Sequence, residues 1–200
     1  MTPTNVFILG GGQYGDEITL GGSDRIITDF QFYYFKLNEA EDPTARIRFY
    51  HNNGQAGAPG TLFYDSGALS LLAGIGDYSY TLTGLSVLVP ETFTWTVEWG
   101  EKPFVCNGWC NLQPFLVGLS TYSPPAIGLS ENSYWSLDYY TSSWVEYSGD
   151  DIFPYNFGAK ITATDIPVSS TFFLVCFGIM NMAFIRGRFN TKVKQRARVA

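Results

Sequence analysis

The sequence predicts an all-β fold, a jelly-roll-like sandwich of two antiparallel sheets followed by a single C-terminal transmembrane helix. Aromatic residues make up 17% of the 200 residues, there are 21 glycines, and only 15% of residues are charged, a composition typical of β proteins. Short apolar runs separated by turn residues extend from Asp24 to Thr164. Residues 166–185 carry no charge, and twenty residues in a helix span about 30 Å, one hydrocarbon thickness.

The clearest period-two alternation lies at Thr92–Trp99. Phe93, Trp95, Val97 and Trp99 share one face of this predicted strand, and three threonines with Glu98 occupy the other. Trp95 and Trp99 would also suit a sugar-stacking platform. Because Phe93 and Val97 complete the same apolar stripe, we expect this face to lie in the core.

The segment Ala45–His51 predicts a half-buried strand, with Ala45, Ile47 and Phe49 directed inward. In Asp24–Leu37 both registers are largely apolar, which indicates a long central strand or a strand with a bulge. The other predicted strands are Thr61–Asp65, Tyr78–Leu82, Leu85–Val89, Phe115–Leu119, Tyr134–Tyr140, Ser143–Tyr147 and Phe157–Thr164.

These patterns divide the chain into four parts. Residues 1–14 are expected to be irregular, 15–165 to form the sandwich domain, 166–185 to form a hydrophobic helix, and 186–200 to form a basic cytoplasmic tail. The expected core includes Ile27, Ile47, Phe49, Phe93, Trp95, Val97 and Ile161.

The net charge of −6 conceals an uneven distribution. Residues 1–165 contain six Lys or Arg and all eighteen Asp or Glu, a net charge of −12, whereas the remainder carries +6. A domain this acidic repels phosphate backbones, so we expect no nucleic-acid partner. The basic residues expected to stop transfer through a membrane include Arg186, Arg188, Lys192 and Lys194.

The uncharged segment predicts a membrane anchor. Its apolar part, from Thr171 through Leu174 and Gly178 to Ile185, exceeds the usual strand length of about 5 to 6 residues, although a last core strand is the alternative. Under the positive-inside rule the basic tail stays in the cytoplasm and the sandwich lies outside. Residues 1–12 lack the features of a signal peptide, so we expect one upstream of Met1; targeting by the C-terminal span itself is the alternative.

Five segments follow one another along the chain: GDEITLGG (15–22), ITDFQFYY (27–34), ARIRFYHNNGQAGAPGTLFYDSG (45–67), LTGLSVLVPETFTWTVEW (82–99) and NFGAKITAT (156–164). Their succession resembles the β-sandwich body of bacterial PEP-CTERM envelope proteins, and the resemblance covers most of residues 15–185. The resemblance implies sorting by an exosortase, an extracytoplasmic location and no catalytic residues. The sorting signal corresponds to Ile166, Pro167, Val168 and Ser169, which keep one proline and lack the usual glutamate; a plain membrane anchor is the alternative.

Two functions follow as hypotheses. The first is a non-enzymatic cell-envelope or extracellular-matrix protein, held at the membrane or released after processing. The alternative is a carbohydrate-binding module acting on exopolysaccharide, with Trp109, Trp135 and Trp144 as loop-adjacent stacking residues. A secreted hydrolase is a third hypothesis, but spacing alone brings no two carboxylates to the separation that glycosidases require. The acids considered are Glu98, Glu101, Glu131, Asp138 and Glu146.

Metal and cofactor chemistry has little support in the sequence. His51 is the only histidine and follows a predicted strand at an Asn-Gly turn. Cys106 and Cys110 are four residues apart and predict a local disulfide in an oxidising compartment, because a zinc site would need two further ligands nearby. Oxygen ligands for calcium are available at Asp16, Glu17 and Asp24 or at Asp150 and Asp151, without an EF-hand pattern. We therefore expect no metal and no cofactor.

Overall fold

The computed structural model of the protein describes residues 5–8, 12–36, 44–72, 74–100, 117–121, 128–130, 132–138, 141–148 and 156–166. These residues form strands and one short 3-10 helix, η1 (Gln55–Gly57). The strands are β1 (Asn5–Ile8), β2 (Gln13–Thr19), β3 (Ile26–Lys36), β4 (Thr44–Tyr50), β5 (Leu62–Ser70), β6 (Gly76–Leu82), β7 (Val87–Leu88), β8 (Thr92–Trp99), β9 (Val117–Thr121), β10 (Leu129–Ser130), β11 (Ser133–Asp138), β12 (Ser143–Ser148) and β13 (Ala159–Thr164).

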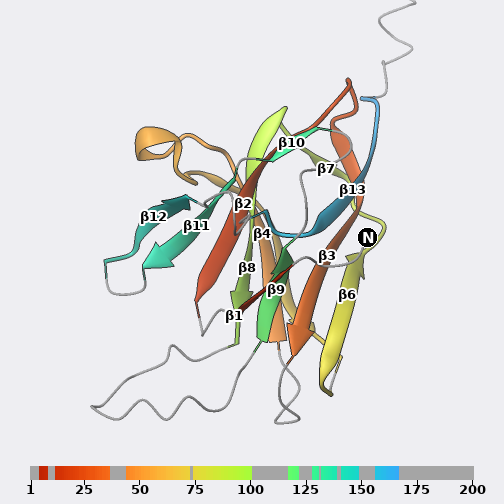
Figure 1. Ribbon diagram of the computed structural model, residues 1–200. Helices are drawn as coiled ribbons and strands as arrows, with labels where there is room; N and C mark the ends of the chain where they lie inside the picture. Colours follow the sequence, from red (N-terminus) through yellow and green to blue (C-terminus); the bar gives the residue numbers. More distant parts are fainter. Residues whose placement is uncertain are drawn as a thin grey trace, which may run out of the picture. The chain divides into compact units, whose positions relative to one another are not determined.

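The strands build two antiparallel sheets (Figure 1), which confirms the predicted all-β class. One sheet has the order β1-β9-β3-β13, with β6 and β7 also pairing with β3. The other has the order β12-β11-β2-β8-β4-β5, with β10 also pairing with β2. The strands β3 and β8, which showed the longest apolar patterns, therefore lie inside their sheets with partners on both sides.

The core lies between the two sheets. Phe30 of β3 contacts both Phe49 of β4 and Trp95 of β8, with ring centroids 5.1 Å and 5.2 Å apart. Trp95 is fully buried, and Trp99 is 5% exposed. The prediction that this face of β8 belongs to the core is confirmed, and neither ring is available as a sugar platform. Of the expected core residues, only Ile161 is partly buried; the fully buried ones are Ile27, Ile47, Phe49, Phe93, Trp95 and Val97.

Part of the N-terminal segment, which was predicted to be irregular, forms strands. Asn5–Ile8 pairs with β9, and β2 begins at Gln13. The strand β2 (QYGDEIT) has no apolar alternation, so its sequence did not predict a strand. It forms because β8 and β11 supply backbone hydrogen-bond partners on both sides.

Two strands contain irregularities in their pairing, and one of these corrects a predicted strand boundary. Register shifts in the pairing of β5 with β4 let β5 continue past Asp65 to Ser70, beyond the predicted end. Gly67 takes a φ of 68° at this point, a conformation that favours glycine. In β3 the register against β13 shifts by one residue at Thr28, so β3 is both a long central strand and a bulged one.

The predicted membrane anchor falls mostly outside the described residues. Ile166 is described and is 53% exposed, whereas residues 167–200, with the predicted span and basic tail, are not described. Within the described ranges, no helix is long and apolar enough to cross a membrane.

Candidate functional site

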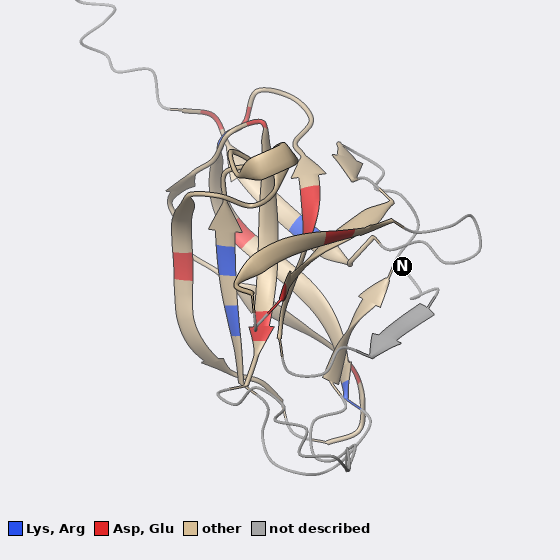
Figure 2. Cartoon of the chain, turned by 90° about the vertical axis from the view of Figure 1, so that its left-hand side faces the viewer, with Lys and Arg blue, Asp and Glu red and all other residues tan. Residues whose placement is uncertain are grey.

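The face of the seven-stranded sheet that points away from the core is polar, and we call it the polar face. Strand alternation produces it: in β4 the apolar Ala45, Ile47 and Phe49 point inward, so Arg46 and Arg48 point outward. Figure 2 shows these two basic positions of β4 beside acidic positions of neighbouring strands. The polar face comprises Gln13, Glu17, Arg46, Arg48, Tyr50, Asp65, Thr94, Thr96, Glu98, Trp135, Trp144 and Glu146, together with Asn52 of the following loop.

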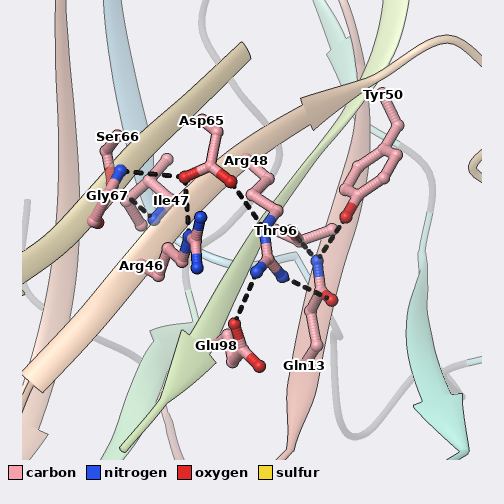
Figure 3. Close-up of polar contacts among 10 residues, drawn as sticks. All are labelled: Gln13, Arg46, Ile47, Arg48, Tyr50, Asp65, Ser66, Gly67, Thr96 and Glu98. Atoms are coloured by element: carbon pink, nitrogen blue, oxygen red, sulfur yellow. Dashed lines mark hydrogen bonds and ion pairs between the residues drawn. The ribbon is translucent and has the colours of Figure 1, made fainter. Parts of the chain in front are cut away.

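Arg48 is the centre of this network, and each of its three nitrogens has a partner (Figure 3). Nε lies 3.1 Å from Asp65 Oδ2, and Nη2 lies 2.9 Å from Glu98 Oε2. Nη1 donates to Gln13 Oε1 at 3.1 Å. The side chain is 16% exposed, so these contacts hold a largely buried guanidinium in one orientation.

Gln13 links Arg48 to the rest of the polar face. Its Nε2 donates to Thr96 Oγ1 at 2.6 Å and to the Tyr50 hydroxyl at 3.0 Å, while its carbonyl oxygen accepts from Arg48. Only 4% of Gln13 is exposed. Three neighbouring strands, β2, β8 and β4, are thereby joined through one amide group.

Asp65 is held as an anion by its neighbours. Burial raises the pKa of Asp65, but hydrogen bonds from Arg46, the Gly67 amide and Arg48 outweigh that effect and lower the pKa to about 2. Arg46 Nε lies 2.7 Å from Asp65 Oδ1, and the Gly67 N–H donates to the same oxygen at 2.8 Å. Asp65 therefore stays ionised throughout the physiological pH range and does not act as a general acid.

Asp65→Asn is expected to reduce the decrease in the free energy of unfolding that the protein shows when the pH is lowered. A native pKa of about 2 lies below the ordinary value of about 3.9, so the stabilisation by Asp65 is complete above about pH 4 and is lost as the pH falls through about 2. Because the Asp65 side chain is 25% exposed, we expect Asp65→Asn to lower the free energy of unfolding by about 1 to 2 kcal/mol at pH 7 and by less at pH 2. Urea unfolding at both pH values measures it; equal losses at both would contradict this origin.

A second polar cluster involves Asn52. Its Nδ2 donates to Glu17 Oε2 at 2.7 Å, and its Oδ1 accepts from Thr94 Oγ1 at 2.8 Å. The loop that carries Asn52 is fixed by Asn53, whose Oδ1 accepts from the Thr61 amide at 2.8 Å. The sequence marked this region only as a turn, because its long-range partners on β2 and β8 are visible only in the fold.

The polar face is concave. Trp144 of β12 contacts Tyr50 of β4, with ring centroids 5.7 Å apart and an interplanar angle of 71°. Four strand steps separate β12 from β4, which in a flat sheet would be about 19 Å. The sheet must therefore curl so that its polar face lies inside the curve. Gly15 of β2 allows a close approach to β8, because a Cβ there would collide with the Trp95 carbonyl oxygen and Thr96 Cγ2.

The three tryptophans predicted as stacking residues have different environments. Trp144 is partly buried at the Tyr50 contact, which leaves part of the ring accessible. Trp135 is on the same face but only 7% exposed, so its ring faces are covered. Trp109, like Cys106 and Cys110, lies outside the described residues. The alternation in Ala45–His51 places Tyr50 on the outward face with Arg46 and Arg48, but it did not single Tyr50 out as a stacking residue.

Asp16 is fully buried on the opposite, inward side of β2. Its Oδ2 lies 2.9 Å from Ser130 Oγ and 3.0 Å from the amide nitrogen of Phe157, and Ser130 Oγ also lies 2.9 Å from Asn156 Oδ1. The Ser130 hydroxyl has one proton but lies within hydrogen-bond distance of two acceptor oxygens. A protonated Asp16 would donate its own proton to Ser130 Oγ, and the hydroxyl proton could then be donated to Asn156. Burial raises the pKa of Asp16 well above its usual range.

Among the described residues no cluster of potential metal ligands is found. No group of three or more His, Cys, Asp or Glu side chains converges there, and Glu17 is tied to Asn52. A cavity of about 380 Å³ lies between the sheets near β13, with a mainly aliphatic lining. It is lined by Ile18, Thr19, Leu20, Gly21, Asp24, Leu129, Ala159, Ile161, Thr162 and Ala163.

Comparison of the chain with protein-family models, with curated proteins and with solved structures finds no match. The polar face must therefore be interpreted from its own chemistry.

Proposed function

We propose that the protein is a non-enzymatic β-sandwich of the cell envelope or extracellular matrix that binds carbohydrate at the polar face. The single observation that carries the binding function is the concave network centred on Arg48, with aromatic rings at the Tyr50–Trp144 contact. This proposal joins the two functions expected from the sequence, with exopolysaccharide as the partner.

The composition of the polar face suits a sugar. A pyranose ring presents hydroxyl groups at its edge and C–H groups on its faces, so it needs oriented polar groups beside an aromatic ring. Parts of Arg46, Asp65 and Glu98 remain accessible, with 44%, 25% and 39% of their side chains exposed. Because their mutual contacts already orient them, less side-chain entropy would be lost on binding.

The state of the carboxylates supports a non-enzymatic role. A glycosidase needs one carboxyl group that stays protonated near neutral pH and a second one close to the same bond. Asp65 has a pKa of about 2 between two arginines, Glu98 is paired with Arg48, and Glu17 accepts from Asn52. Asp65 is therefore suited to accepting hydrogen bonds rather than to transferring protons.

Binding at the polar face predicts a specific loss in Trp144→Ala. We expect affinity for a bound polysaccharide to fall by about tenfold, because the exposed part of the ring and its contact with Tyr50 are removed. A glycan array followed by titration measures the effect. Tyr147→Ala is the matched control, since Tyr147 lies on the opposite face of the same strand and should leave affinity unchanged. Failure of the protein to bind any glycan, or equal losses in both variants, would contradict the proposal.

The envelope location depends on the segment after the sandwich. An uncharged stretch of twenty residues followed by six basic residues supports a membrane anchor, and its order resembles the sorting signal of PEP-CTERM proteins. In this proposal the sandwich faces away from the cytoplasm, and an exosortase is the processing partner. The degenerate motif at Ile166–Ser169 makes a permanent anchor the alternative to processing.

Removal of residues 166–200 tests the anchor. The full chain is expected to sediment with membranes and to require detergent, because about twenty apolar residues would otherwise be exposed to water. A shortened chain that ends at Asp165 is expected to stay in the supernatant with a β-type circular dichroism spectrum. Membrane fractionation of both forms measures this. A full chain that stays in the supernatant without detergent would contradict the anchor.

A further inference from the structure

We infer that the carbohydrate bound at the polar face is an uncharged polysaccharide. The inference rests on the proposed function and specifies its ligand. It follows from the ion pairs and hydrogen bonds that the basic groups of the polar face already make. An acidic polysaccharide, with uronate or sulfate groups, needs cationic partners that are accessible and not neutralised by nearby anions.

The two arginines of the polar face form ion pairs with carboxylates of the same surface. All three nitrogens of Arg48 contact Asp65, Glu98 or Gln13, and its side chain is 16% exposed. Arg46, although 44% exposed, directs its Nε to Asp65 at 2.7 Å. An anionic sugar would have to compete with Asp65 for these groups, and releasing Asp65 would leave a partly buried carboxylate without its partners.

The surrounding charge disfavours an anion further. The polar face carries Arg46 and Arg48 against Glu17, Asp65, Glu98 and Glu146, an excess of negative charge. The sandwich as a whole carries −12 over residues 1–165. A polyanion approaching this surface is therefore repelled at long range and finds no uncompensated cation there among the described residues.

A neutral sugar avoids these costs. Its hydroxyl groups both donate and accept, so they can bind the accessible edges of Glu98 and Arg46 without breaking the ion pairs beneath. Its C–H face can pack on the accessible part of the Trp144 ring. Because no charge pairing is involved, binding should depend little on ionic strength.

Affinity electrophoresis of the full chain in non-ionic detergent tests this. Native gels would contain a neutral polymer, such as dextran, hydroxyethyl cellulose or galactomannan, or an anionic one, such as alginate or hyaluronan. We expect retardation by at least one neutral polymer and by neither anionic polymer. Raising NaCl from about 20 mM to about 500 mM should change the dissociation constant by less than about twofold.

Arg46→Gln provides the matched variant, because it removes the more exposed of the two arginines of the polar face but keeps a hydrogen-bond donor. For a neutral ligand we expect affinity to fall by less than about tenfold, with the same weak salt dependence. Preferential binding of an anionic polymer, weakened about tenfold or more by salt and abolished in Arg46→Gln, would overturn this inference and leave the proposed function standing. Binding of neither class would overturn the proposed function, and this inference with it.

Discussion

Trp95→Ala is expected to lower the free energy of unfolding by about 3 to 5 kcal/mol. Trp95 is fully buried between the two sheets and contacts Phe30 and Phe32, with ring centroids 5.2 Å and 6.5 Å away. Alanine would leave a cavity that strands β3 and β8, each paired on both sides, cannot close by moving together. Urea denaturation followed by tryptophan fluorescence and circular dichroism measures the loss.

Two further variants show whether this loss comes from packing. Trp95→Phe should lose clearly less than Trp95→Ala, because Trp95 Nε1 has no hydrogen-bond partner among the described residues and an aromatic ring is kept. Thr81→Ala, at an exposed position of β6, should change stability by less than about 0.5 kcal/mol. A loss below about 1 kcal/mol in Trp95→Ala would show that Trp95 is not packed as described.

Asp16→Asn is expected to change how the free energy of unfolding depends on pH above about pH 4, whereas Asp65 acts below that pH. The native pKa of Asp16 is raised, so between about pH 4 and that raised value the unfolded chain releases a proton that the native protein keeps. Stability contributed by Asp16 is thus complete at low pH and falls as the pH rises, by up to about 1.4 kcal/mol per pH unit. In Asp16→Asn this decrease should be absent.

Urea unfolding of the two proteins at several pH values between 4 and 9 gives the comparison. Asparagine keeps an oxygen for the Phe157 amide, so the variant should fold. Asp77→Asn, at an exposed position of β6, is the matched control and should follow the wild-type curve. Parallel curves for Asp16→Asn and wild type would show that Asp16 ionises without cost. The sign is opposite to that of Asp65, whose stabilisation is lost on the acid side.

Much of the core could be predicted because alternation is a local property. In β4 and β8 every second residue is apolar, and a pleated strand places such residues on one face. Burial of Ile47, Phe49 and Trp95 followed directly from that pattern. The candidate site could be predicted only in part: Trp144 was identified, but Trp135 proved buried and Tyr50 was not singled out.

What the sequence determined by itself was the all-β class, the strands with clear alternation, and the division of charge between an acidic body and a basic end. Only the tertiary structure decided that the polar QYGDEIT segment is an interior strand, because its backbone partners and the contacts of Gln13 and Asp16 come from residues 35 to 141 positions away. Only the curl of the sheet brings Trp144 to Tyr50. Local pattern reports which face a side chain takes, whereas long-range pairing decides which other side chains it meets there.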